Sequence, residues 1–183
     1  MKLPLAIVGM LTVFIGVSLA QNTESPATLK IGGPAPDFAL PYATKDTIIF
    51  SPLKLSDEIG KRNIVLAFYP ADWSGGCTEE MCTIRDDFDN LVKLNAEVLP
   101  ISGDYVYSHR EWAQHHNLPF KLLSDHNHAV AMKYNSYNEV SGLNKRTVYV
   151  IDKVGKIAYM NLQYSVRTPD DFQKLKEVLA SLN

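Results

Sequence analysis

The sequence has few cysteines and no excess of basic residues. Two cysteines among 183 residues allow one intramolecular disulfide at most. Lysine and arginine total 18 against 20 for aspartate and glutamate, a net charge of −2, so the charge balance does not favour binding to nucleic acid or anionic lipid. The chain also lacks internal repeats and low-complexity tracts. With 46% hydrophobic residues it is long enough to bury one sizeable core, and we expect no nucleic-acid partner.

The N-terminus has the charge and hydropathy pattern of an export signal. Lys2 is followed by an apolar run over residues 3–20 that ends in small residues. This pattern predicts a signal peptide over residues 1–20; the alternative is a membrane anchor or tether through residues 3–20, which are just numerous enough to span a bilayer. Either interpretation predicts an exported protein, periplasmic or extracellular. Residues 21–30 are polar and are expected to form a flexible tether before a folded domain over residues 31–183.

In the expected domain, strand-like apolar runs alternate with helical patterns, which is typical of an α/β fold. The expected strands are Asp37–Leu40, Thr47–Ser51, Asn63–Tyr69, Glu97–Ser102, Thr147–Ile151 and Ile157–Leu162. The run Asn63–Tyr69 has no polar alternation, so we expect a central strand that is covered on both faces and ended by Pro70. Pro100 lies inside a later run and removes a backbone donor, which predicts a bulge or an edge position.

Two helices are indicated by their apolar stripes. The first stripe has spacings of four and three residues and consists of Cys77, Met81, Ile84, Phe88 and Leu91. This spacing predicts one long amphipathic helix that opens at Cys77. The last helix has Thr168 as its expected N-cap and Pro169 at its first position. Its expected inward-facing residues are Phe172, Leu175, Leu179 and Leu182.

A cysteine in the first turn of a helix is suited to nucleophilic chemistry. Unpaired backbone N–H groups and the positive end of the helix dipole favour the thiolate of Cys77 over its thiol. Ser74 places a hydroxyl three residues before the cysteine, and Gly75 and Gly76 allow backbone amides to approach a small bound molecule closely. This arrangement suits a substrate with two oxygen atoms.

The segment from Phe68 to Cys82 resembles the active-site segment of the peroxiredoxin family of the AhpC/TSA type. The family pattern is proline, three residues, threonine or serine, two residues and cysteine, and Pro70, Ser74 and Cys77 fit it. The similarity continues, in the right order, through Gly33–Phe38, Pro100–Asp104 and Arg146–Asp152. The five-residue spacing of the two cysteines resembles the bacterioferritin-comigratory protein and peroxiredoxin-Q subgroup. The resemblance implies a thioredoxin-like fold with a central mixed sheet flanked by helices.

By this resemblance, the chain is expected to be a thiol-dependent peroxidase that reduces hydrogen peroxide and organic hydroperoxides. Cys77 is the implied peroxidatic nucleophile, which attacks the O–O bond and becomes a sulfenic acid. The hydroxyl of Ser74 is expected to bind the peroxide, and Pro70 to shield the sulfur from water. Arg146 is expected to hold the thiolate and polarise the peroxide, and Glu80 to orient this arginine.

The same resemblance makes Cys82 the resolving cysteine, which forms an intramolecular disulfide with Cys77. In an intact helix the two Cα atoms lie about 8.6 Å apart, whereas a disulfide needs less than about 7 Å. We therefore expect oxidation to unwind residues 77–82, and a thioredoxin-like or other thiol reductant to reverse the change. No cofactor or metal is expected, and the chain is expected to be a monomer or a weak homodimer.

Each assignment has a simpler alternative. Cys77 would then be a small buried hydrophobic residue, and Cys82 an unpartnered thiol or half of a static disulfide. Ser74 would be only an N-cap, Glu80 only a residue that favours the helix start, and Arg146 a surface ion-pair partner. The five histidines have no spacing typical of a metal site, and histidines in polar loops are usually solvated. They are His109, His115, His116, His126 and His128.

Two other functions compete with the peroxidase. The first is an exported thioredoxin-like thiol–disulfide oxidoreductase with a degenerate Ser-x-x-Cys motif, because Trp73–Cys77 resembles Trp-Cys-x-x-Cys with its first cysteine replaced. That replacement would abolish dithiol exchange. Such proteins also carry a cis-proline before the facing strand, where this chain has Arg146. The second is a non-catalytic binding module of the same fold, which retention of Ser74, Cys77 and Arg146 together argues against.

Overall fold

The computed structural model describes residues 29–183. The expected signal segment and nearly all of the expected tether therefore lie outside the described residues. The helices are α1 (Leu55–Glu58), α2 (Gly75–Asp86), α3 (Phe88–Lys93), α4 (Val106–His116), α5 (Ala129–Lys133) and α6 (Pro169–Ser181). The strands are β1 (Ala39–Ala43), β2 (Ile48–Lys54), β3 (Asn63–Phe68), β4 (Ala96–Ser102), β5 (Leu122–Ser124), β6 (Tyr137–Asn138), β7 (Leu143–Asn144), β8 (Thr147–Ile151) and β9 (Ile157–Asn161). Within the described residues, no helix has the length and apolar character needed to cross a membrane.

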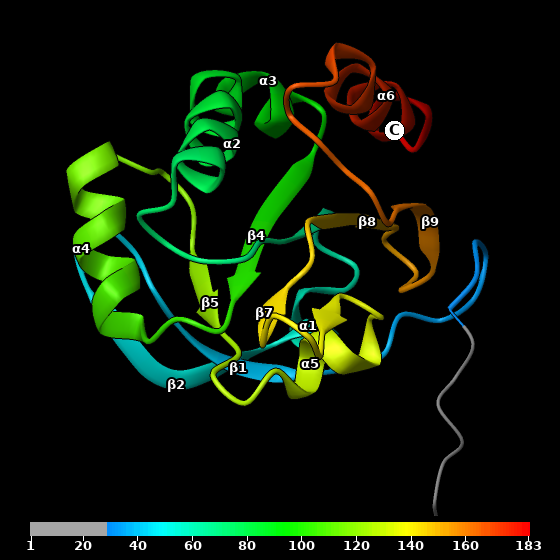
Figure 1. The fold of residues 1–183 in the computed structure, drawn as a ribbon. Coiled ribbons are helices and arrows are strands. Elements are labelled where there is room, and N and C mark those ends of the chain that lie inside the picture. The colour runs from blue at the N-terminus through cyan, green and yellow to red at the C-terminus, as the bar shows by residue number, and fades with distance from the viewer. Residues whose placement is uncertain (1–28) are drawn as a thin grey trace, which may run out of the picture.

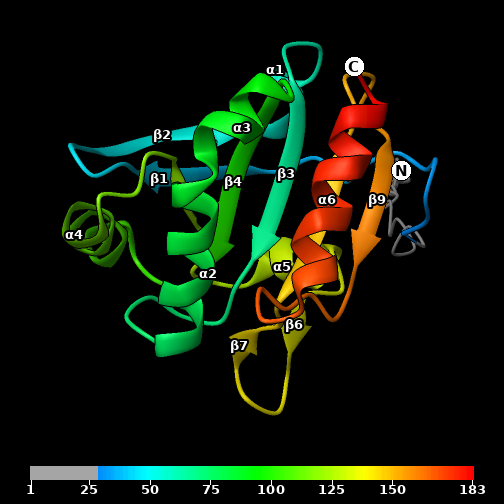
Figure 2. The ribbon, with the colours of Figure 1, turned by 90° about the horizontal axis from the view of Figure 1, so that it is seen from above.

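Seven of the strands form one mixed sheet in the order β2-β1-β5-β4-β3-β8-β9. The pairs β3–β4 and β4–β5 are parallel, and the other neighbouring strands are antiparallel. Helices α2, α3 and α6 lie over one face of the sheet, and α1 and α5 lie on the other side (Figure 1). The view from above shows α2 and α3 near β4 and α6 between β3 and β9 (Figure 2), and α6 packs against β8 and β9. The predicted α/β class, with a central mixed sheet flanked by helices, is confirmed.

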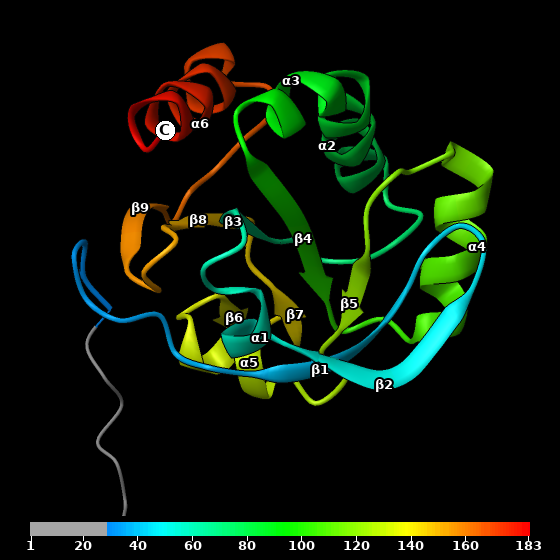
Figure 3. The same cartoon turned by 180° about the vertical axis from the view of Figure 1, so that it is seen from behind.

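The remaining long helix, α4, closes one end of the sheet. It packs against β1, β2 and β5, and the view from behind shows the β1–β2 hairpin reaching it (Figure 3). This position brings α4 close to the loop that leaves β3, because β3 and β5 both flank β4.

Strand β3 occupies the middle of the sheet and is buried along its whole length. Val65 and Ala67 belong to the core beneath α2, α4 and α6. Ile64 and Leu66 belong to the core on the opposite face, with α1 and α5. Alternate side chains of a strand point to opposite faces, and each fully buried aliphatic side chain contributes about 1.5–3 kcal/mol relative to its exposed state. The loop that leads to Cys77 therefore starts from a firmly packed strand, as the sequence predicted.

The long helix predicted from the Cys77 stripe is instead two helices, α2 and α3, separated at Asp87. The carboxylate of Asp87 accepts a hydrogen bond from the side-chain amide of Asn90 at 2.6 Å. The backbone of Asp87 leaves the helical region, with ψ at 11°. The Asp87 side chain makes no capping bond to the backbone of α3, and aspartate is among the weaker helix formers, so a break at this residue is tolerated. The apolar stripe continues across the break, since Leu91 in α3 remains buried.

The prediction that Pro100 lies at an edge or a bulge is wrong. Pro100 pairs in regular register with Ala67 inside β4, between β3 and β5. The carbonyl oxygen of Ile101 accepts a hydrogen bond from the backbone N–H of Tyr69, which follows β3, so the backbone polar groups of Ile101 face β3. Successive residues of a strand direct these groups to opposite sides, so those of Pro100 face β5. Strand β5 pairs with only the last two residues of β4, so no ladder donor is needed at the proline.

All six predicted strands are present, with ends displaced by three residues or fewer. The final helix starts as predicted, with Thr168 at the N-cap and Pro169 first, and it buries Leu175 and Leu179. Three short strands, β5, β6 and β7, were not predicted. They have two or three residues each, too few to carry a periodic pattern.

Candidate active site

Cys77 is the third residue of α2, just beyond the loop that follows β3. The helix begins at Gly75, two residues earlier than predicted, with Ser74 as its N-cap residue. The first bond within the helix runs from the Thr78 N–H to the Ser74 carbonyl at 2.9 Å, so the amides before Thr78 have no acceptor inside the helix. Cys77 is fully buried at this positive helix end.

Arg146 lies between β7 and β8 and reaches the cysteine. Its Nη2 is 3.5 Å from the Sγ of Cys77, and its Nη1 donates a hydrogen bond to Oε2 of Glu80. Burial alone lowers the pKa of Arg146, but the charges of Glu80 and Cys77 outweigh it and raise that pKa above its ordinary value. The guanidinium therefore stays charged between the sulfur and the carboxyl group.

Glu80 is fully buried and lies on the same helix as Cys77, less than one turn further on. Burial raises the pKa of Glu80 to about 7, although the nearby Arg146 guanidinium acts in the opposite direction. Its second oxygen, Oε1, has no hydrogen-bond partner among residues 29–183. One carboxyl group on α2 thus fixes the arginine beside the cysteine of the same helix.

Pro70 and Ser74 lie in the loop between β3 and α2, and their side chains are half-buried. The Ser74 hydroxyl donates to the carbonyl oxygen of Ala71 at 3.1 Å and makes no capping bond to α2. In the part of the chain that the structure describes, no hydrogen bond joins Ser74 to Cys77 or Arg146. The structure therefore brings Cys77, Arg146 and Glu80 into direct contact and places the other two predicted residues in the adjoining loop.

Cys82 lies further along α2 and is half-buried, and the thiols of Cys77 and Cys82 are both free. Because α2 is continuous from Gly75 to Asp86, the two cysteines are held five residues apart on an intact helix. An S–S bond between them needs rearrangement of this helix.

Gly75 and Gly76 form the first turn of α2 rather than a flexible loop. A Cβ atom on Gly76 would lie 3.2 Å from Nη2 of Arg146, whereas one on Gly75 would meet nothing within 4 Å. Gly76 therefore leaves the space that the guanidinium occupies beside Cys77. This packing requirement depends on a residue 70 positions away, and the sequence carries no local signal for it.

The interpretation of all five histidines as solvated is wrong for His109, which is fully buried. His109 lies on the inward face of α4, and its Nδ1 is 2.9 Å from the carboxylate of Asp72 in the loop before Cys77. Its spacing from Val106 and Trp112, three residues in each direction, is the sequence signal that could have indicated burial. No cluster of three or more potential ligand side chains that could hold a metal is found between residues 29 and 183.

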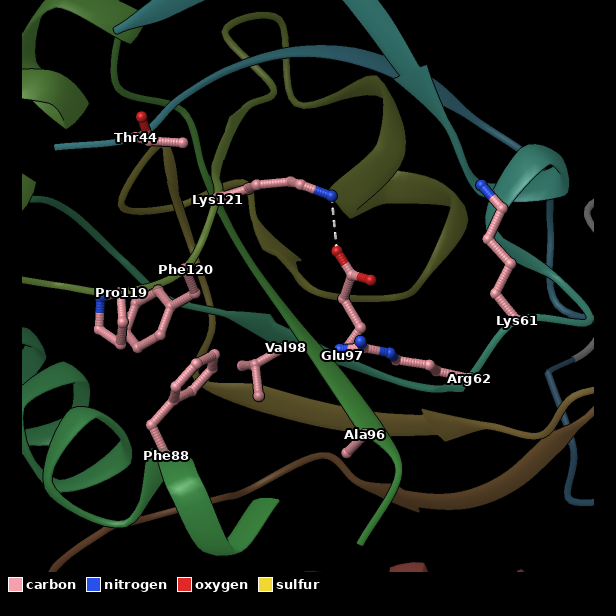
Figure 4. Close-up of a pocket in the computed structure, with 10 residues that line it drawn as sticks. All are labelled: Thr44, Lys61, Arg62, Phe88, Ala96, Glu97, Val98, Pro119, Phe120 and Lys121. Atoms are coloured by element: carbon pink, nitrogen blue, oxygen red, sulfur yellow. Dashed lines mark hydrogen bonds and ion pairs between the residues drawn. The ribbon is translucent and has the colours of Figure 1, made fainter. Parts of the chain in front are cut away.

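A pocket of about 550 Å³ lies away from the cysteine, where β3 and β4 begin (Figure 4). Its charged lining includes Lys121, whose Nζ bonds Oε1 of Glu97 at 2.6 Å, so this lysine is already paired. Open sheets bind ligands beyond the carboxyl ends of their parallel strands, which is where Cys77 lies. The pocket is therefore distinct from the thiol site.

Taken together, these features define a class of protein with a thiol site on an α/β fold. In this class the central strand of a mixed sheet leads to a buried cysteine at a helix start, and an arginine lies beside the cysteine. The sequence profile of the AhpC/TSA family matches residues 31–160. The chain therefore belongs to the AhpC/TSA family.

Curated relatives and solved structures agree with this assignment. Peroxiredoxin Bcp of Bacillus subtilis is 38% identical over 137 residues, covering 71% of this chain and 83% of that protein. Chloroplastic peroxiredoxin Q of Triticum aestivum is 38% identical over 130 residues, covering 70% of this chain and 57% of that protein. The match thus spans little more than half the length of the wheat relative. The resemblance to the Bcp and peroxiredoxin-Q subgroup, predicted from the active-site segment, is confirmed.

The crystal structure of peroxidoxin BcpB from Mycobacterium tuberculosis has a TM-score of 0.73 and 28% identity, and the match covers 85% of this chain and 99% of that one. The reduced 2-Cys peroxiredoxin of Plasmodium vivax has the same TM-score at 24% identity, covering 82% of this chain and 96% of that one, which supports the fold alone. These likenesses confirm the predicted thioredoxin-like fold. Family membership also favours the peroxiredoxin interpretation over the degenerate thioredoxin-like oxidoreductase.

Proposed function

We propose that the protein is a thiol-dependent peroxidase that reduces hydrogen peroxide and organic hydroperoxides. The observation that carries the proposal is the 3.5 Å contact between Arg146 Nη2 and Cys77 Sγ at a buried helix start. The Cys77 thiolate attacks the nearer peroxide oxygen, an S–O bond forms and the O–O bond breaks. The departing hydroxide or alkoxide takes up a proton and leaves as water or alcohol, and Cys77 becomes a sulfenic acid.

Arg146 serves two steps of this reaction. Its planar guanidinium holds the negative charge on sulfur in the free enzyme and faces the charge that develops on the peroxide oxygens during attack. Glu80 holds that guanidinium in place from α2. Ser74, with its hydroxyl in the adjoining loop, binds the peroxide, and Pro70 shields the sulfur from water.

Cys82 resolves the sulfenic acid. Its thiolate attacks the Cys77 sulfur, the S–S bond of an intramolecular disulfide forms as the S–O bond breaks, and the departing hydroxide takes up a proton and leaves as water. Since both cysteines lie on the continuous helix α2, this step requires its first turns to unwind. A thioredoxin-like or other thiol donor then reduces the disulfide, and α2 forms again.

We place this reaction outside the cytoplasm, because residues 1–20 have the sequence pattern of an export signal. An exported enzyme does not draw directly on cytosolic thioredoxin, so its reductant is a thioredoxin-like protein of the same compartment. The enzyme acts as a monomer or weak homodimer and needs no cofactor.

Stopped-flow measurement of hydrogen peroxide consumption by the reduced protein tests the proposal, with Cys77→Ser as the matched variant. Rapid consumption by the wild type that is lost in Cys77→Ser is expected. Insulin reduction without peroxide turnover would instead support a thiol–disulfide oxidoreductase. The absence of both activities would support a non-catalytic binding module.

A further inference from the structure

The loop that presents Cys77 is anchored through a buried carboxylate, that of Asp72. The Asp72 side chain has no exposed surface. It accepts hydrogen bonds from the Tyr69 hydroxyl at 2.8 Å and from the Ser108 hydroxyl at 2.8 Å, and its Oδ2 lies 2.9 Å from Nδ1 of His109. Ser108 and His109 both belong to α4, so this carboxylate connects the loop to a different part of the fold.

The His109 ring extends this connection to β5. Its Nε2 lies 3.2 Å from the carbonyl oxygen of Leu123 in β5, and a carbonyl oxygen can only accept, so Nε2 carries hydrogen. Its Nδ1 faces the carboxylate of Asp72, which also accepts. The hydroxyl of Tyr69 also lies 3.4 Å from Nδ1, so the buried ring is held from β5, from the loop and from the end of β3.

The backbone of the loop has a second anchor beside the first. The Asp72 N–H donates to Oδ2 of Asp104 at 2.9 Å, and the Ser102 hydroxyl donates to the same oxygen at 2.8 Å. The ionisable groups that contact the His109 ring are Asp72 on the loop and Tyr69 after β3, whereas Asp104 after β4 contacts the Asp72 backbone. Neither anchor touches Cys77, Arg146 or Glu80.

Between the anchors and α2, the chain turns sharply at Trp73. This residue has φ of 60°, a left-handed conformation that is costly for a bulky side chain and persists only when the surroundings hold it. Its indole N–H donates to the Ser108 hydroxyl at 3.2 Å, and the Ser74 N–H that follows donates to the Asp72 carbonyl at 2.7 Å. The conformation that starts α2 is therefore held from Asp72 and α4.

We propose that Asp72 and His109 are positioning residues for the reaction at Cys77. Their pairing holds the loop before α2 so that the cysteine stays beside Arg146, and it opposes the unwinding of α2. The proposal rests on the proposed peroxidase function, because it concerns two steps of that reaction. Cys77 attacks peroxide while α2 is folded, and Cys82 resolves the sulfenic acid after α2 has unwound. Weakening the pair slows the first step and speeds the second.

The test compares His109→Leu with wild type in three measurements. The second-order rate constant for Cys77 oxidation by hydrogen peroxide is expected to fall about tenfold, because displacements below 1 Å at a reacting group carry penalties of this size. The ratio of disulfide to sulfinic acid at fixed peroxide is expected to rise severalfold. Amide hydrogen exchange across residues 73–82 is expected to accelerate more than exchange in β3 and β4.

Three further variants separate positioning from a general loss of stability. His109→Asn keeps one donor facing Asp72, so it should recover part of the lost rate. Ser108→Ala removes one bond to the carboxylate and the acceptor of the Trp73 indole N–H, and it should change the rate and the ratio in the same directions, even where His109→Leu does not fold. Leu55→Ala removes a buried side chain of α1, in the core on the opposite face of the sheet from Cys77. It should lower the melting temperature without changing the oxidation rate or the ratio of products.

The positioning proposal is overturned if His109→Leu and Ser108→Ala leave the rate and the ratio unchanged, or if Leu55→Ala shifts both equally. The failure of the proposed function has a different signature, because wild-type protein would then not consume peroxide at all. In that case, unchanged exchange across residues 73–82 in the variants would still overturn the structural role of the pair.

Discussion

The guanidinium of Arg146 lies 3.5 Å from the sulfur of Cys77, although 69 positions separate the two residues in the chain. The register of the sheet explains this contact. Strand β8 pairs with β3 so that Thr147 is opposite Phe68. The residue before β8 therefore lies next to the loop that leaves β3, and a six-residue strand buried on both faces fixes this relationship.

Replacement of Arg146 by lysine should lower the rate of Cys77 oxidation by about 100-fold, the size of effect seen when one preorganised donor is lost. Lysine keeps a positive charge, but it has no planar fork that contacts the sulfur and Glu80 together. Stopped-flow peroxide consumption measures the effect. Arg167→Lys is the matched control, because Arg167 also pairs with a glutamate of α2, Glu79, but on an exposed surface. Equal rates for wild type and Arg146→Lys would contradict the assigned role.

Gly76→Ala should slow peroxide consumption, because its methyl group would lie 3.2 Å from Nη2 of Arg146 and displace the guanidinium by a few tenths of an ångström. We expect a reduction of about threefold to tenfold. Gly75→Ala should reduce the rate less, since its methyl group meets open space, and should raise stability by about 0.4–1 kcal/mol. An equal loss of rate in both variants would show that helix flexibility, rather than the space beside Arg146, is what matters.

Glu80→Gln should flatten the dependence of stability on pH. Because burial raises the pKa of Glu80 from 4.5 to about 7, the folded protein retains a proton at pH values where the unfolded chain has released it. The stability contributed by this group is therefore fully present below about pH 4.5 and is lost as the pH rises to about 7, by up to roughly 3 kcal/mol. Urea unfolding at pH 5 and pH 8 measures the difference. The wild type should lose more stability than the variant over this interval, and equal losses would contradict the prediction.

The sequence predicted the parts of the site that local patterns determine. The uniform apolar run of β3, the proline after it and the stripe from Cys77 onward indicated a buried strand followed by a helix with the cysteine at its start. The contact with Arg146 was expected only from family resemblance, because it depends on the pairing of β3 with β8. The break at Asp87 and the interior position of Pro100 escaped prediction, since one is a change in backbone conformation at a single residue and the other depends on how far β5 extends. The burial of His109 was missed although its three-residue spacing from Val106 and Trp112 indicates it, whereas its pairing with Asp72, 37 positions away, has no local signal.

Cys82→Ser should separate the first oxidation step from turnover. The thiol of Cys82 is five residues from Cys77 on an intact helix and does not contact the reacting sulfur, so the first oxidation of Cys77 should proceed at the wild-type rate. Without a resolving thiol, further peroxide should convert the sulfenic acid to sulfinic acid, and the mass of the protein should rise by about 32 Da, for two oxygen atoms.

Mass spectrometry after peroxide treatment checks this outcome, and Cys77→Ser, which should not gain these oxygens, is the control. In the wild type, the same treatment should form the disulfide and decrease the helical circular dichroism signal, because residues five apart cannot be bridged while the helix persists. Full catalytic turnover by Cys82→Ser with a dithiol donor, without sulfinic acid, would mean that an external thiol resolves Cys77 directly. In that case α2 would not need to unwind during the cycle.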